Sequence, residues 1–135
     1  MKINVLGPSP SDQILEQVTA LIEKQRDEIL ERHKKLPPTN MQRALVKAVP
    51  GQLLEFCRQC PEFAQKILDD PKKDLTGCLK ACDKQTDRDR SDDAVYLCAA
   101  QYYAPGCAVR NVRTLILDPA KEKPKAQTVN ILDWL

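Results

Sequence analysis

Apolar residues recur at three- and four-residue steps over residues 14–30, the spacing that places them on one face of an α-helix. Ser9-Pro10-Ser11-Asp12 has the composition of a helix start, and Pro37-Pro38 ends the helix because proline cannot continue it. The apolar stripe consists of Ile14, Leu15, Val18, Leu21, Ile22, Ile29 and Leu30. It lapses at Gln25 and lasts too few heptads for a convincing dimeric coiled coil, so we expect it to pack on the rest of the chain.

Shorter helical patterns follow over residues 39–70. Thr39-Asn40-Met41-Gln42 is a capping box, and we expect its helix to end at Val49-Pro50-Gly51, where proline and glycine interrupt the pattern. Two short buried helices are then predicted, one over residues 52–60 and one that Pro61 opens.

Two further helices are expected between residues 74 and 103. Asp74 can cap a segment that carries apolar residues as far as Cys82, and the polar residues 83–93 read as a solvated connection. Ser91 then caps a helix with two aspartates in its first turn, which Pro105-Gly106 stops.

After residue 107 the pattern changes. Residues 112–117 form a short β-like run and residues 1–6 are similarly strand-prone, so the two could pair beside the helices. Residues 118–128 are rich in lysine and proline and are expected to form a flexible tether, while residues 129–135 are abruptly apolar.

The pattern as a whole predicts a mainly α protein with one compact helical domain of about five helices. A short β element and a flexible C-terminal tail accompany it. We divide the chain into an N-terminal segment with the long amphipathic helix (1–36), a helical core (37–117) and a tail with an apolar terminal motif (118–135).

Composition narrows the class of protein. A chain of 135 residues with 42% hydrophobic content can close one core, and a net charge of +2 creates no strong field for nucleic acid or membrane. The N-terminal residues lack the apolar core of a secretory signal, and no run reaches the length of a membrane span. We therefore expect a cytoplasmic protein whose six cysteines are reduced.

Candidate chemistry is sparse. His33 is the single histidine and lies among charged residues, so we expect a solvent-facing side chain and no enzyme. Cys57, Cys60, Cys78 and Cys82 have separations that could enclose a zinc ion, but both pairs lie in helix-patterned apolar segments. Core thiols are the favoured interpretation. A zinc-supported nucleic-acid module stays an alternative, and we predict no metal and no cofactor.

Partner-binding residues are expected among the aromatic and terminal apolar side chains. Tyr102 and Tyr103 are candidate anchors, because tyrosine and tryptophan contribute much of the affinity at interfaces. Ile131, Leu132 and Trp134 in the tail are the others, since an apolar motif on a charged tether normally docks in a groove of its own domain or of a partner.

Three stretches of the middle of the chain match a known pattern in order and spacing. They are Pro61-Glu62-Phe63-Ala64-Gln65-Lys66-Ile67-Leu68, Leu75-Thr76-Gly77-Cys78-Leu79, and Ser91-Asp92-Asp93-Ala94-Val95-Tyr96 leading into Ala99 and Tyr102-Tyr103. On these residues the region 53–103 resembles the PcfK-like proteins, a small family that overlaps with anti-CRISPR inhibitors of the type II RNA-guided nuclease.

The resemblance implies an anti-CRISPR protein of a phage or mobile element, active in the bacterial cytoplasm. Its partner would be a type II effector nuclease or its guide-RNA complex, blocked by protein–protein binding without catalysis. An alternative is an accessory protein of a conjugative plasmid or phage. Residues 127–135 are similar to hydrophobic tails that dock on the replication clamp, so such a protein could bind a replication or transfer protein through this tail.

Overall fold

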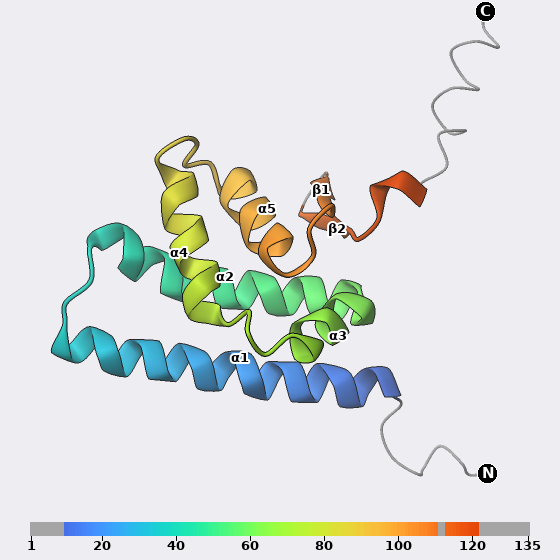
Figure 1. The fold of residues 1–135 in the computed structure, drawn as a ribbon, viewed down its shortest axis with the longest axis horizontal. Helices are drawn as coiled ribbons and strands as arrows, with labels where there is room; N and C mark the ends of the chain where they lie inside the picture. Colours follow the sequence, from blue (N-terminus) through green and yellow to red (C-terminus); the bar gives the residue numbers. More distant parts are fainter. Residues whose placement is uncertain (1–9, 111–112, 122–135) are drawn as a thin grey trace, which may run out of the picture.

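The computed structural model describes residues 10–110 and 113–121, and within them the chain is mainly α-helical (Figure 1). The helices are α1 (Pro10–Lys35), α2 (Asn40–Gln59), α3 (Pro61–Asp69), α4 (Leu75–Thr86) and α5 (Asp92–Tyr103). A hairpin of β1 (Ala108–Arg110) and β2 (Thr114–Ile116) and the 3-10 helix η2 (Pro119–Lys121) follow. The predicted mainly α fold of about five helices is confirmed.

Helix α2 lies in the middle of the helical packing, with α1 on one side and the pair α4 and α5 on the other. The long helix α1 runs along one side and contacts α2, α3 and α4, while α4 and α5 pack against each other and lie over the other side of α2 (Figure 1). Val18, Ile22 and Ile29 of the amphipathic stripe are buried in the core. The long helix is therefore part of the same packed unit as the other helices. Within the described part of the chain, no helix combines the length and apolarity needed to cross a bilayer.

Aromatic rings from three helices meet in the centre of the core. Phe56 of α2 packs edge-on against Phe63 of α3, with ring centroids 6.2 Å apart, and Phe63 packs in the same way against Tyr103 of α5 at 6.3 Å. Edge-to-face pairs of this kind contribute roughly 0.5–1.5 kcal/mol beyond the area they bury. This aromatic cluster joins α2, α3 and α5.

The predicted break at Val49-Pro50-Gly51 is wrong, because α2 continues through Pro50 to Gln59. Proline inside a helix costs about 3 kcal/mol through a lost hydrogen bond and a steric clash. The continuous helix buries one apolar face formed by Leu45, Val46, Val49, Leu53, Phe56 and Cys57. Burying each large side chain contributes about 1.5–3 kcal/mol, so tertiary packing outweighs the local cost.

The predicted solvated connection over residues 83–93 is shorter than expected. Helix α4 continues for another turn to Thr86, which is 6% exposed and whose hydroxyl donates a hydrogen bond to the Asp83 carbonyl at 2.6 Å. Residues 87–93 are exposed. The N-terminal caps agree with the sequence analysis, since the Asp74 and Ser91 side chains accept hydrogen bonds from Gly77 and Ala94.

The hairpin differs from the predicted pairing of residues 1–6 with residues 112–117. Strand β2 falls in the second run, but it pairs antiparallel with β1, and residues 1–6 lie outside the described residues. A partner strand adjacent in sequence costs less loop entropy than one over a hundred residues away.

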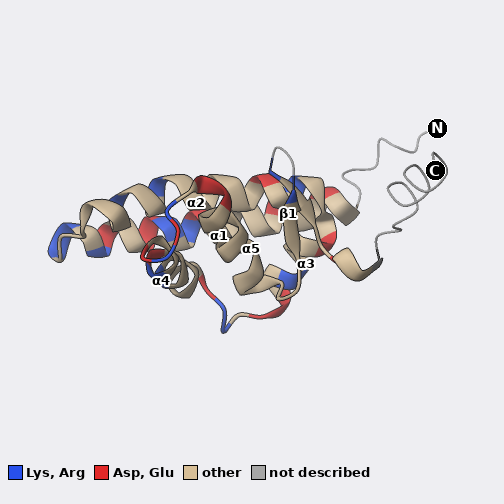
Figure 2. Cartoon of the chain, turned by 90° about the horizontal axis from the view of Figure 1, so that it is seen from above, with Lys and Arg blue, Asp and Glu red and all other residues tan. Residues whose placement is uncertain are grey.

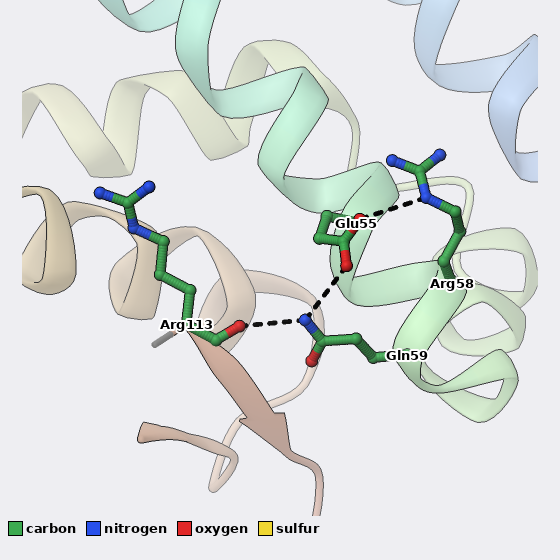
Figure 3. A network of polar contacts seen from close by, with 4 residues as sticks. All are labelled: Glu55, Arg58, Gln59 and Arg113. Carbon is green, nitrogen blue, oxygen red and sulfur yellow. Dashed lines mark hydrogen bonds and ion pairs between the residues drawn. The ribbon is translucent and has the colours of Figure 1, made fainter. Parts of the chain in front are cut away.

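A single side chain of α2 ties the hairpin to the helices. The amide of Gln59 donates to the carbonyl of Arg113 at 3.0 Å and accepts from the backbone N–H of Leu115 at 2.8 Å. Figure 3 shows the first of these bonds, with Glu55 bonded to both Gln59 and Arg58 on the same helix. The Gln59 amide thus pairs with the backbone at the start of β2 as a neighbouring strand would.

Candidate protein-binding groove

A groove with an open volume of about 290 Å³ lies where α1 passes into α2 and α4 crosses them. Its floor and walls are formed by Ile29, Arg32, His33, Leu36, Pro37, Pro38, Gln42, Leu45, Thr76, Leu79, Lys80 and Asp83. Leu36 is 78% exposed, which makes it the most exposed of the large hydrophobic residues that the structure describes. Exposed apolar surface of this kind, bordered by polar residues, is typical of interaction sites.

Local sequence explains how the groove is held open. Pro38 precedes the N-cap Thr39, whose hydroxyl accepts from the Gln42 N–H at 3.1 Å while the Gln42 side chain accepts from the Thr39 N–H. This capping box starts α2 immediately after the turn and leaves Leu36 outside both helices. Gln42 also donates to Asp83 of α4 at 3.4 Å, which links two walls of the groove.

Basic side chains border the groove. Arg32 and His33 in the last turn of α1 line one wall, and Lys80 of α4 is exposed on the opposite wall together with one carboxylate, Asp83. Arg32 donates to the Thr76 hydroxyl at 2.6 Å, so its guanidinium is held across the space between α1 and α4. Figure 2 shows Lys and Arg gathered at this end of the molecule, interleaved with Asp and Glu. An apolar floor with a mainly basic rim suits a segment that is apolar and carries carboxylates.

His33 was expected to face solvent, but the structure places it half-buried in the groove wall. The sequence analysis missed the groove itself. Leu36 lies seven residues after Ile29 and therefore continues the same helical face. That spacing is the signal that could have indicated an apolar site at the end of α1.

Of the two predicted tyrosine anchors, Tyr103 lies in the core and Tyr102 lies at its edge. Tyr103 is 4% exposed, its hydroxyl has no hydrogen-bond partner among the described residues, and burial raises its pKa. It therefore offers a partner almost no surface. Tyr102 is half-buried, packs edge-on against Tyr103 with centroids 5.0 Å apart, and places its hydroxyl where a Cβ on Gly77 would lie. The position of Tyr102 indicates a packing role between α5 and α4.

The other three predicted anchors, Ile131, Leu132 and Trp134, lie outside the described residues. The structure neither brings them to the groove nor separates them from it.

The structure arranges the thiols differently from the candidate zinc set. Cys57, Cys78 and Cys82 are buried and Cys60 is half-buried. In the described residues, no group of three or more His, Cys, Asp or Glu side chains is placed to hold a metal ion. The thiols of Cys78 and Cys82 in α4 instead donate to the backbone carbonyls of Ala99 and Val95 in α5, each at 3.8 Å.

Burial and neighbouring thiols shift the acidity of these cysteines. Desolvation raises the pKa of Cys57 to about 12. Interaction with the neighbouring Cys82 thiol, together with burial, raises the pKa of Cys78, and interaction with Cys78 lowers the pKa of Cys82. At neutral pH, Cys57 and Cys78 are protonated and pack as small apolar side chains.

No family model, no curated protein and no solved structure matches this chain.

Proposed function

We propose that this chain is a binding protein that inhibits a type II RNA-guided DNA nuclease, an anti-CRISPR protein of a phage or mobile element. The observation that carries the binding role is the apolar groove with its basic rim at the junction of α1, α2 and α4. The resemblance of residues 53–103 to the PcfK-like family supports the choice of partner. Inhibition of this kind acts by occupancy and needs no reactive group.

The size of the groove limits how many side chains of a protein partner it would hold. A volume of about 290 Å³ lies at the lower end of the range for small-molecule pockets, so it accommodates one or two anchoring side chains. A specific protein complex buries about 1,600 Å² in total. The partner would therefore also cover the surrounding basic rim. On the nuclease, the covered surface would be one that guide, target DNA or a moving nuclease domain must use.

The deciding experiment is cleavage of target DNA by a panel of type II nucleases with and without this chain. We expect one or more nucleases to be inhibited. Leu36→Glu should weaken inhibition at least tenfold, because it places a carboxylate in the apolar floor. Leu30→Glu is the matched control, since Leu30 is also exposed on α1, at 39%, but does not line the groove.

Two results would contradict the proposal. If no nuclease of the panel is inhibited, the choice of partner is wrong. If inhibition occurs and Leu36→Glu inhibits as strongly as the unmodified chain, the groove is not the binding surface.

A second candidate follows from the sequence of residues 127–135, namely an accessory protein that binds a replication or transfer protein such as the sliding clamp. Capture of the chain by immobilised clamp, lost when Leu132 and Trp134 are replaced by alanine, would favour this function. Retained nuclease inhibition by the same double variant would assign the two activities to different parts of the chain.

A further inference from the structure

We propose that the groove is occupied, in the absence of another partner, by residues 129–135 of a second copy of this chain. The inference concerns the regulation of the groove and rests on its role as a protein-binding surface in the proposed function. It does not depend on which protein the groove captures.

The chemistry of the segment matches that of the groove. Residues 129–135 have the sequence Val-Asn-Ile-Leu-Asp-Trp-Leu, in which Asp133 is the single charged residue among five apolar ones. The groove offers apolar contacts from Leu36 and Leu79 and positive charge from Arg32 and Lys80 on opposite walls. The apolar side chains of the segment would contact the apolar part of the groove, and the Asp133 carboxylate would meet the positive charges at its rim.

Docking within one chain would require an almost fully extended connection. Figure 1 places η2, which ends at Lys121, toward the N-terminal end of α1, whereas the groove is lined by the C-terminal part of α1 from Ile29 onward. The part of α1 from Pro10 to Ile29 is ~29 Å long at ~1.5 Å per residue. Residues 122–130 span at most ~32 Å when fully extended, so docking in the same molecule would leave this connection almost no conformational freedom.

A second copy removes this restriction. Two molecules side by side and antiparallel along their long axes place the end of η2 in each beside the groove of the other. Each tail can then enter its partner's groove over a short distance. The exchange is reciprocal, so it closes as a two-fold symmetric dimer with the same contact made twice. A protein partner that binds the groove would have to displace the tail, which couples capture of the partner to dissociation of the dimer.

The full chain contains its own reporter for this contact. Trp134 is the single tryptophan, so tryptophan fluorescence reports on the tail alone. We expect its emission to shift to shorter wavelength as protein concentration rises, with sedimentation showing a monomer–dimer equilibrium over the same concentrations. An emission typical of exposed tryptophan at every concentration would overturn the proposal. So would a blue-shifted emission independent of concentration, which indicates docking within one chain, or a dimer whose Trp134 stays exposed.

Three variants test the contact within the full chain. Leu36→Glu should weaken dimerisation at least tenfold and leave Trp134 exposed, whereas the control Leu30→Glu should leave both unchanged. Lys80→Glu should weaken dimerisation several-fold, and combining it with Asp133→Lys should restore it, because the charges are exchanged across the contact. Circular dichroism checks that each variant keeps its helices. Unchanged dimerisation of folded Leu36→Glu, or no restoration by the charge exchange, would refute the assigned site.

These measurements use the purified chain alone and are independent of the nuclease assay. If dimerisation fails while Leu36→Glu still loses nuclease inhibition, the groove binds a partner but not the tail. If dimerisation succeeds while no nuclease is inhibited, the tail contact stands and the choice of nuclease as partner is wrong.

Discussion

Gly77, in the first turn of α4, allows the close approach of α5. A glycine in a helix is usually less stable than alanine by about 0.5–1 kcal/mol, so the sequence alone predicts that Gly77→Ala stabilises the protein. The structure predicts the opposite. A Cβ on Gly77 would overlap the Tyr102 hydroxyl and lie 2.9 Å from Tyr102 Cζ.

The expected magnitude follows from the two opposing contributions. Tyr102 packs edge-on against Tyr103 with ring centroids 5.0 Å apart, so the ring cannot move without losing this contact. Overpacking of this kind costs about 1–3 kcal/mol. After the gain in helix propensity is subtracted, Gly77→Ala should lower the free energy of unfolding by about 1 kcal/mol. For a chain of 135 residues that corresponds to a Tm lower by about 4 °C.

A double-mutant cycle measured by urea unfolding and circular dichroism isolates the contact. In a Tyr102→Ala background the obstacle is absent, so Gly77→Ala should now stabilise the protein by about 0.5–1 kcal/mol. The sign of the Gly77→Ala effect therefore reverses between the two backgrounds. A stabilising effect of Gly77→Ala while Tyr102 is present would refute the reasoning.

Three further predictions concern single side chains. Tyr103→Phe should raise the free energy of unfolding by about 1 kcal/mol, because it removes a buried hydroxyl that has no partner among the described residues and keeps the ring contacts; urea unfolding checks this, and a destabilised variant contradicts it. Gln59→Ala removes both the donor to Arg113 and the acceptor of the Leu115 N–H and should speed hydrogen exchange of the Leu115 amide at least several-fold, measured by NMR; unchanged protection would show that Gln59 does not hold the hairpin. Burial raises the pKa of Cys57 to about 12 in the folded state, against 9.0 ordinarily. The contribution of the protonated thiol to the free energy of unfolding is therefore complete below pH 9 and is lost as pH rises toward 12. The free energy of unfolding should fall in that window by up to ~1.4 kcal/mol per pH unit, and less steeply in Cys57→Ala; equal slopes in the two proteins would contradict the buried thiol.

The elements that the sequence predicted well depend on interactions within one segment. The stripe of α1, the proline end at residues 37–38 and the caps Thr39, Asp74 and Ser91 involve residues at most a few positions apart. Hydrogen bonds and side-chain spacing over such distances are the same in an isolated segment and in the folded protein. This is why periodicity and capping residues were sufficient to locate these helices.

The continuity of α2 through Pro50 illustrates the opposite case. Local rules predict a break there, but the face that α2 presents to α1, α4 and α5 is buried from Leu45 to Cys57. The gain from burying that face exceeds the cost of one proline. Only the tertiary packing supplies this gain, so no inspection of residues 49–51 alone could reveal it.

By itself, the sequence determined the helical class, most helix ends and the burial of three of the four candidate thiols, Cys57, Cys78 and Cys82. The tertiary structure decided which of these surfaces meet: Tyr103 in the core, Cys98 beside Cys82, and Leu36 exposed in a groove between three helices. The physical reason is that helix formation depends on neighbours within one or two turns, whereas a core or a groove depends on faces that come together from distant segments.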